Sequence, residues 1–427
     1  MAADTAIDIR LPLHVPGAYG DLPPGWSWSR LDALCKGVYD CPHSTPKLAP
    51  SGAYLARTQD ISSGVFRPER AARVSDETYT ERTARVVPHE GDLLYSREGT
   101  YFGVAAEVPP DTKICLGQRM VLIRPDEKAL DFRFLRHWLN SPIMAEYING
   151  FRDGSVAERL NLPTIRSLPV PVPPIPEQRK ISDTLGAVEE KIESIRRQST
   201  LIAEFVPTLF SSIVGVVKTF TRFDTLANCV KGASYRSADL QPSSTALVTL
   251  KSFDRNGGYK TSGLKQYTGP YKSSQLLKPG DLVVAQTDIT QAAEVVGRVV
   301  RVPEQRTFEF LVASLDLLII RPIRDIPIEF LYGVMLEEDF REHCRSRTSG
   351  TTVLHLASDA VPAYRAPQVE PRIQRHFAAT VKPLLIRQDA IGHELASLSA
   401  IGNALLPALL SRRIRFAEAH DIGGTLT

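Results

Sequence analysis

PPIPEQRKISDTLGAVEEKIESIRRQSTLIAEFVPTLFSSIVGVV, residues 173–217, is the stretch that decides the fold. The proline-rich residues from Pro163 to Pro176 lead into it and predict a stiff, extended strap, because proline is tolerated only in the first turn of a helix. From about Glu177, apolar residues recur at steps of four and three, which predicts a long helix with one narrow apolar stripe. Only Ser199 interrupts the stripe. Such a helix needs a partner, since alone it would leave the stripe in water.

The partner pattern lies in the same chain, between Gln374 and Ile414. Gln178-Arg179 matches Gln374-Arg375 at the start of the two stretches, and a Pro-x-Leu motif recurs at Pro207 and Pro407. We expect the two helices to pack antiparallel, with kinks at their internal prolines. The residues expected in the packing seam are Ile181, Leu185, Val188, Ile192, Ile195, Ile202, Phe377, Val381, Leu384, Ile391, Leu395 and Leu398. The pattern alone leaves open an ordinary homodimeric coiled coil.

Short motifs elsewhere also occur twice, in the same order. The matches are Gly91-Asp-Leu-Leu94 with Gly280-Asp-Leu-Val283, Leu122-Ile-Arg-Pro125 with Ile319-Ile-Arg-Pro322, Phe134-Leu135 with Phe330-Leu331, and Gly154-Ser155 with Gly350-Thr351. A domain-sized repeat fixes the architecture. It predicts a mixed α/β fold in which two pseudo-repeated globular domains are separated by a long antiparallel two-helix coiled coil. The expected parts are a lead-in (1–24), a first domain (25–174), a central helix (175–217), a second domain (218–369), a C-terminal helix (370–416) and a tail (417–427).

Within the first domain, residue preferences predict three strands and one helix. Strands are expected at Ala53–Thr58, Asp92–Tyr95 and Met120–Ile123. An amphipathic helix is expected over Phe132–Ile148, because its large apolar residues share one face.

Composition excludes several classes of function. The net charge of +3 permits nucleic-acid binding through local patches without requiring it. Five scattered cysteines without a Cys-x-x-Cys motif, and no apolar run long enough to span a bilayer, favour a reduced, cytoplasmic protein without a membrane segment. Cys41-Pro-His43 and His343-Cys344 lack the spacing of metal ligands, so no metal is expected. Asp92 and Asp281 are interpreted as residues that begin strands. No phosphate-binding loop, dinucleotide fingerprint or methyltransferase motif occurs, so we expect neither ATP hydrolysis nor methylation by this chain alone.

The layout resembles the specificity subunit of type I restriction–modification systems over roughly residues 25–415. The resemblance is carried by Leu168-Pro-Val-Pro-Val-Pro-Pro-Ile-Pro-Glu-Gln-Arg179 ahead of the seam helix, by Gly154-Ser155, and by Gly91-Asp-Leu-Leu94 with Ser96-Arg97. The second copy departs from the pattern, with Ala366-Pro-Gln-Val-Glu-Pro-Arg-Ile-Gln374 in place of Pro-Pro and Glu-Gln.

The resemblance implies two target-recognition domains, each reading half of a split target in double-stranded DNA. It also implies partners: two methyltransferase subunits and an ATP-dependent restriction subunit, which use S-adenosylmethionine, ATP and Mg, while this chain binds no cofactor and catalyses nothing. The central helix rises roughly 38–48 Å over its seam. This corresponds to roughly 11–14 base pairs, slightly more than one duplex turn.

We expect DNA contacts from basic, hydroxyl and amide residues in loops that differ between the two copies. The candidates are Arg57, Arg97, Thr100, Tyr101, Ser155, Arg159, Lys251, Arg255, Gln286, Thr287, Thr351, Thr352 and His355. Any one of them is as readily an ordinary solvated residue. We also expect that Arg97→Ala weakens DNA binding without lowering stability. The alternative function is a protein–protein scaffold without base reading, which would lack salt-sensitive, sequence-selective DNA binding. An enzyme would need a cluster of titratable residues that the sequence does not display.

Overall fold

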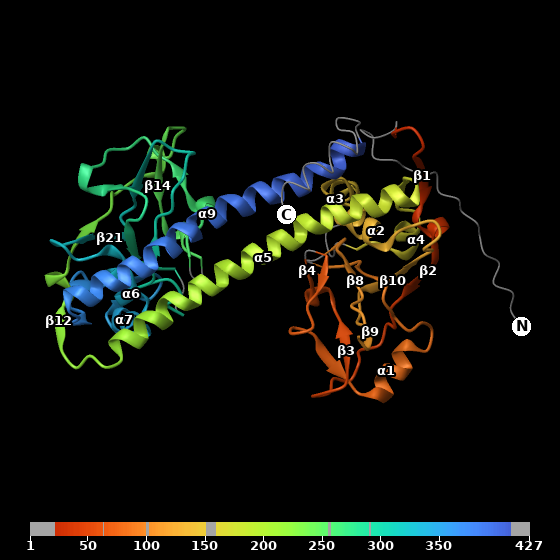
Figure 1. The fold of residues 1–427 in the computed structure, drawn as a ribbon, viewed down its shortest axis with the longest axis horizontal. Helices are drawn as coiled ribbons and strands as arrows, with labels where there is room; N and C mark the ends of the chain where they lie inside the picture. Colours follow the sequence, from red (N-terminus) through yellow and green to blue (C-terminus); the bar gives the residue numbers. More distant parts are fainter. Residues whose placement is uncertain are drawn as a thin grey trace, which may run out of the picture. The chain divides into compact units, whose positions relative to one another are not determined.

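The computed structural model describes residues 22–62, 64–99, 102–150, 159–254, 258–289 and 292–410. The fold is mixed α/β, and the chain divides into two compact units. Met1–Ser194 with Ala396–Thr427 form the first unit, and Ile195–Leu395 form the second. Two helices of 40 residues, α5 (Ile175–Val214) and α9 (Pro371–Leu410), each contribute to both units (Figure 1).

The first unit is built on an antiparallel sheet with the strand order β2-β10-β7-β8. These strands are β2 (Cys35–Asp40), β7 (Leu93–Ser96), β8 (Ala105–Glu107) and β10 (Met120–Pro125). The other strands are β1 (Ser27–Arg30) paired with β11 (Pro169–Val172), β4 (Ile61–Ser62) paired with β5 (Val65–Phe66), and a sheet of β6 (Ala72–Val74), β3 (Ala53–Ala56) and β9 (Ile114–Leu116). The shorter helices are α1 (Asp76–Thr83), α2 (Phe132–Leu139), α3 (Pro142–Asn149) and α4 (Leu162–Arg166).

The second unit has a main antiparallel sheet with the order β13-β21-β17-β19. These strands are β13 (Ala227–Lys231), β17 (Leu282–Ala285), β19 (Val299–Arg301) and β21 (Leu317–Pro322). The others are β12 (Phe220–Arg222) paired with β24 (Arg365–Pro367), a sheet of β15 (Lys265–Gln266), β14 (Thr245–Val248), β20 (Phe310–Ala313) and β16 (Leu276–Leu277), and a sheet of β18 (Thr287–Asp288), β23 (Leu354–Leu356) and β22 (Thr348–Ser349). The shorter helices are α6 (Ile328–Leu336), α7 (Glu338–Arg345) and α8 (Ala360–Ala363). The two main sheets share one strand order. When the four strands of either sheet are counted along the chain, the first lies at one edge beside the fourth, the second lies on the other side of the fourth, and the third forms the other edge.

The main sheet of the first unit is buried on both faces, and alternate residues serve different cores. Leu93 and Tyr95 of β7 pack in a cluster with residues of α2, α3, α5 and α9. Leu94, between them, belongs to a second cluster with Ile114 and Leu116 of the neighbouring sheet. A strand that is buried on both faces has a continuous apolar sequence, which is why Leu93–Tyr95 could be predicted as a strand.

Helices α5 and α9 run antiparallel within each unit. In the first unit Val188 lies opposite Gly402. In the second unit the rings of Phe210 and Phe377 are 5.3 Å apart. Of the twelve residues predicted for the seam, eight are buried, and the other four, Ile192, Ile202, Leu384 and Leu395, are partly buried. The apolar stripe of each helix therefore faces the interior of the unit that it crosses.

The one polar interruption of the stripe is matched by a polar residue on the facing helix. Ser199 accepts a hydrogen bond from the side-chain amide of Gln388 at 2.6 Å. Beside it, Arg387 donates to Gln198 at 3.0 Å. A polar pair within an apolar seam favours the register that brings the two side chains together.

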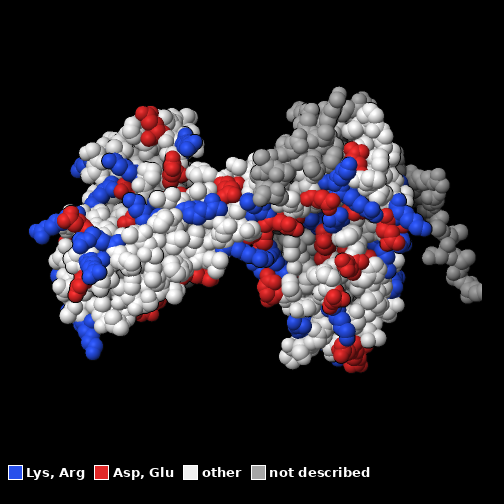
Figure 2. All heavy atoms as spheres, in the orientation of Figure 1, with Lys and Arg blue, Asp and Glu red and all other residues white. Residues whose placement is uncertain are grey.

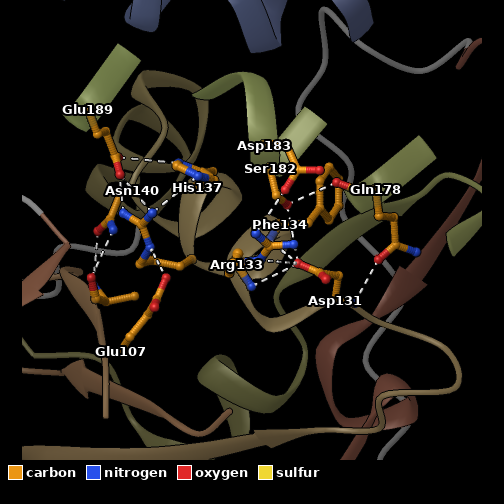
Figure 3. A network of polar contacts seen from close by, with 12 residues as sticks. Glu107, Asp131, Arg133, Phe134, His137, Asn140, Gln178, Ser182, Asp183 and Glu189 are labelled. Atoms are coloured by element: carbon orange, nitrogen blue, oxygen red, sulfur yellow. Dashed lines mark hydrogen bonds and ion pairs between the residues drawn. The ribbon is translucent and has the colours of Figure 1, made fainter. Parts of the chain in front are cut away.

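The glutamines that the sequence matched, Gln178 and Gln374, hold the starts of the two long helices. Gln178 is fully buried, and its amide donates to the carbonyls of Pro173 and Ala129, while its oxygen accepts from the backbone N–H of Asp131 (Figure 3). Gln374 donates in the same way to the carbonyl five residues before it, that of Val369, at 2.8 Å. Each glutamine thus joins the segment before a long helix to the helix itself.

Two other repeated motifs prove to be partners of each other. Asp92 accepts two hydrogen bonds of 2.7 Å from Arg124. Asp281 pairs with Arg321 at 2.6 Å in the second unit. Gly91 has a φ of 90°, which glycine adopts without strain. Interpreting Asp92 and Asp281 as residues that begin strands agrees with these contacts.

Three predicted segments differ from the structure. The helix expected over 132–148 is two helices, because Ser141 caps α3 and Pro142 occupies its first turn. The strap contains helix α4 and the strand β11, whose prolines are tolerated because β11 pairs on one edge with β1 alone. The central helix ends at Val214, not Val217. Helix α9 continues through Pro383 and Pro407 to Leu410, and the rest of the predicted C-terminal helix lies outside the described residues.

A buried arginine ties the first unit's sheet to α5. Arg136 on α2 donates to Glu107 of β8 at 2.7 Å, and to both carboxylate oxygens of Glu189 on α5 at 3.0 and 2.7 Å (Figure 3). His137 lies 3.4 Å from Glu189. Burial of the Glu189 carboxyl opposes its ionisation, but hydrogen bonds from His137 and Arg136 outweigh burial and lower its pKa to about 2.

This arrangement predicts acid sensitivity of the first unit. A carboxyl whose pKa is lower in the folded state contributes stability above its unfolded pKa, here 4.5, and that contribution is lost as the pH falls toward 2. Glu189→Gln should therefore reduce the loss of stability between pH 4.5 and 2, measured as urea midpoints across this range. The exposed neighbour Glu190→Gln is the control. Equal pH dependence in both variants would contradict the role given to Glu189.

Candidate nucleic-acid interface

A basic hollow lies at one edge of the first unit's main sheet. It is open to solvent, has a volume of about 180 Å³ and is lined by His43, Arg97, Glu98, Gln118, Arg119 and Arg159. The strand register explains the grouping: Val121 pairs with Asp40, and Met120 pairs with Ser96. The end of β2, the end of β7 and the start of β10 therefore meet at this edge, and the residues just beyond the strands line the hollow.

Asp40 organises the inner wall of the hollow. Its carboxylate accepts a hydrogen bond from Arg97 at 3.1 Å, lies 3.4 Å from His43, and accepts from the backbone N–H of Cys41 at 2.9 Å. Arg97 itself is only 4% exposed. Its guanidinium is thus held in place by a carboxylate and presents little surface of its own.

The outer wall is more accessible. The Arg119 side chain is 58% exposed and lies 3.3 Å from Glu98. Its φ of 70° is unusual for a residue with a side chain. Such conformations cluster at functional sites because the surrounding structure must enforce them. Arg159 is exposed and pairs with Glu98 through a backbone bridge. Guanidinium groups of this kind can bind phosphates or the edges of guanine bases.

The structure brings together only some of the residues predicted for the first domain. Arg97 and Arg159 line the hollow. Arg57 does not, because its guanidinium binds the buried carboxylate of Asp60 at 2.9 and 3.1 Å. Thr100, Tyr101 and Ser155 lie outside the described residues.

Sequence reasoning missed four residues of the hollow, His43, Glu98, Gln118 and Arg119. His43 was considered only as a metal ligand, and Gln118 and Arg119 belong to no repeated motif. For Gln118 and Arg119 the available signal is their position just before the predicted strand at Met120, because loop residues at strand ends often form binding sites.

The second unit places polar residues at the corresponding edge of its own main sheet. Gln286 follows β17, and Thr287 lies opposite His355 in the pairing of β18 with β23. Thr287 is buried and donates to Asp316 at 3.1 Å. Thr351 and Thr352 are exposed in the turn between β22 and β23. Lys251 is exposed elsewhere in the unit, and Arg255 lies outside the described residues.

Several arginines of the second unit hold a loop in place. The carbonyl of Glu294 accepts hydrogen bonds from Arg298 at 2.6 Å and from Arg341 at 3.0 Å. Burial lowers the pKa of Arg341, and the nearby Arg298 and Arg345 lower it further. The backbone N–H of Val296 donates to Asp288 at 3.1 Å. Residues 294–298 are therefore anchored by charged side chains.

Within the described part of the chain, no group of His, Cys, Asp and Glu is arranged to hold a metal ion. None of the helices in those residues is long and apolar enough to cross a membrane.

Comparisons with known proteins agree on one family. Residues 54–203 match the family described as type I restriction modification DNA specificity domain. The EcoBI specificity subunit of Escherichia coli is 26% identical over 200 residues, which cover 45% of this chain and 41% of that protein. The EcoDI specificity subunit of the same organism is 23% identical over 202 residues, with the same coverage. The aligned stretch thus spans about two fifths of either relative.

A solved structure extends the likeness of the fold to most of the chain. The crystal structure of the type I restriction–modification system S subunit from M. genitalium superposes with a TM-score of 0.61 and covers 91% of this chain and 96% of that one. At 16% sequence identity, this likeness concerns the fold alone.

The geometry around Asp40 leads to a different prediction for one substitution. Because Arg97 is buried against Asp40, Arg97→Ala should destabilise the first unit by about 2 kcal/mol, because the Asp40 carboxylate loses its arginine partner and keeps only His43 and the backbone N–H of Cys41. Arg159→Ala, at an exposed site, should change stability by less than about 0.5 kcal/mol. Urea denaturation followed by circular dichroism measures both. Unchanged stability of Arg97→Ala would restore the simpler view that Arg97 only binds ligand.

Proposed function

We propose that this chain, which belongs to the family of type I restriction–modification specificity subunits, reads a split, asymmetric DNA target and directs modification and restriction subunits to it. The basic hollow of the first unit is the observation that carries the proposal. It places two exposed arginines, Arg119 and Arg159, with His43 and Gln118 at one sheet edge beside Glu98, where they can bind phosphates and base edges.

The two units are proposed as pseudo-repeated target-recognition domains, at about residues 25–174 and 218–369. The shared strand order of their main sheets supports this repeat. The loops at the corresponding edges differ: arginines line the hollow of the first unit, whereas the second presents Gln286, Thr351, Thr352 and His355. Different side chains should recognise different bases, so the two half-targets should differ.

The chain is proposed to be non-catalytic and to act with DNA in the cytoplasm. Methyltransferase subunits, in two copies, would bring S-adenosylmethionine, and a restriction subunit would bring ATP and Mg. No cofactor is assigned to this chain.

The second half of α5 is proposed as a surface for a methyltransferase subunit. Between Arg197 and Lys218 its only charged residue is Glu204. Leu201 and Phe205, one turn apart, have exposed fractions of 64% and 47%. Figure 2 shows few charged side chains on the face of the second unit formed by this part of α5. An exposed aromatic and leucine whose only charged neighbour in this stretch is the acidic Glu204 fit a protein partner better than a polyanion.

The DNA-binding role is tested by removing charge at the outer wall of the hollow. Arg119→Asn tolerates the positive φ and removes the guanidinium. The variant is tested as the full chain in complex with its methyltransferase, and its affinity for target DNA should fall by about tenfold. In a plot of the logarithm of affinity against the logarithm of salt concentration, the slope should become shallower by about one. Lys113→Ala is the control, since Lys113 lies outside the hollow and pairs with Asp76. Fluorescence anisotropy across a salt series measures both. Sequence-independent binding by the wild type would favour the scaffold function.

The partner surface is tested by introducing charge into it. Phe205→Glu should weaken assembly with the methyltransferase subunit by at least about tenfold, because a carboxylate would be desolvated in the interface. Glu204→Gln, a neighbouring exposed position, should leave assembly unchanged. Isothermal titration calorimetry compares the two variants, and normal assembly of Phe205→Glu would place the interface elsewhere.

A further inference from the structure

A buried arginine outside the hollow holds one of its walls. Arg82, in the last turn of α1, donates through Nε and a terminal nitrogen to the carbonyl of Leu116 at 3.0 and 2.7 Å. The same guanidinium donates to the carbonyl of Pro42 at 3.2 Å and to that of Ser44 at 3.1 Å. It therefore joins the end of β9 to the irregular segment that follows β2.

The segment is also held from the hollow side. Gln118 donates to the carbonyl of His43 at 3.2 Å and to the Thr45 hydroxyl at 3.4 Å. Three consecutive carbonyls, those of residues 42 to 44, are therefore bound by side chains from other parts of the unit. Pro42 and Pro46 further restrict the segment. His43, which lies between the two residues of this segment whose carbonyls Arg82 binds, lines the hollow.

We propose that Arg82 is a positioning residue that sets the sequence selectivity of the first unit by fixing the segment Pro42–Thr45. It is 7% exposed and its donors are occupied by backbone carbonyls, so it acts through the segment and not by touching DNA. The inference rests on the proposed function.

The physical reason is the difference between phosphate contacts and base contacts. Phosphates are present in every sequence, so a loosened loop can keep much of its electrostatic attraction. Base recognition needs donors and acceptors held in a fixed geometry, because a displaced hydrogen bond no longer discriminates. Lysine in place of Arg82 keeps the charge, but its single ammonium group cannot span the carbonyls of Leu116, Pro42 and Ser44 together.

The experiment uses the full chain in complex with its methyltransferase. Affinities are measured for the target and for DNA with one base pair changed in either half-site. The first unit's half is the one in which replacing a charged phosphate by a neutral methylphosphonate no longer weakens binding once Arg119 is replaced by Asn. Arg82→Lys should reduce discrimination in that half by about tenfold, within the usual cost of a mismatched base pair. Discrimination in the other half and the salt dependence should stay unchanged.

Arg73→Lys is the matched control. Arg73 is a second structural arginine of the first unit, which donates to the carbonyl of Gly52 and the hydroxyl of Tyr54, both at 2.8 Å, and lies outside the hollow. It should leave discrimination in both halves unchanged. Pro46→Gly loosens the segment while leaving Arg82 in place, and should reproduce the loss in the first half.

The outcomes separate this inference from the proposed function. No sequence preference in the wild type would overturn the proposed function itself. A selective wild type with an equally selective Arg82→Lys, or with losses of similar size in both halves, would overturn the role of Arg82 alone. Should Arg82→Lys fail to fold, Pro46→Gly decides: a loss confined to the first half supports the inference, and full selectivity overturns it.

Discussion

The apolar contact between α5 and α9 is the constraint on which both units depend. Each helix completes the cores of the units that it crosses: Ile181 and Leu185 of α5 and Leu405 and Leu409 of α9 pack in the first, while Phe210 and Phe377 pack in the second. The first unit therefore completes its core only with a second, distant piece of chain that begins at Ala396, whereas the second unit is one continuous piece, Ile195–Leu395, with part of a long helix at each end. The polar pair of Ser199 and Gln388 makes the register of this contact specific, because sliding one helix along the other would separate the two side chains.

Ion pairs also join each main sheet to a long helix, at the margin of the apolar core. In the first unit Arg136 bridges Glu107 of the sheet and Glu189 of α5. In the second, Arg301 occupies the sheet position corresponding to Glu107 and pairs directly with Asp389 of α9. In each unit a long helix thus contributes a carboxylate. In the first unit the positive partner is Arg136 of α2, which also binds Glu107 of the sheet, whereas in the second unit Arg301 belongs to the sheet itself. The position of the contact is shared by the two units, while the residues that make it differ.

Much of the architecture could be predicted from the sequence, because helix packing and strand burial leave periodic patterns. The seam residues, the glutamines at the helix starts and the paired Gly-Asp and Arg-Pro motifs all follow from local pattern or internal repetition. The break at Ser141-Pro142 was visible as a capping residue before proline, but the continuous apolar face of residues 132–148 outweighed it. Helix α4 is only five residues long and lies within a proline-rich stretch, so periodicity could not identify it.

The site was less predictable because charge does not reveal what an arginine binds. Arg57, Arg82 and Arg97 are similar in sequence terms, yet their guanidinium groups bind different partners: buried Asp60, backbone carbonyls, and Asp40 beside the hollow, respectively. Arg119 and Gln118 reach the hollow through a strand register that no single-sequence pattern encodes. Predicting contacts from charge and loop position therefore selects anchoring residues together with accessible ones.

The central claim is that two differing units of one chain read two parts of one DNA target. The most direct test is to co-express the chain with its methyltransferase partner and map methylated bases across the host genome. The account predicts one split motif, with two unlike halves separated by a gap of fixed length and unspecified bases. Methylation without sequence preference, or a single uninterrupted motif, would contradict it.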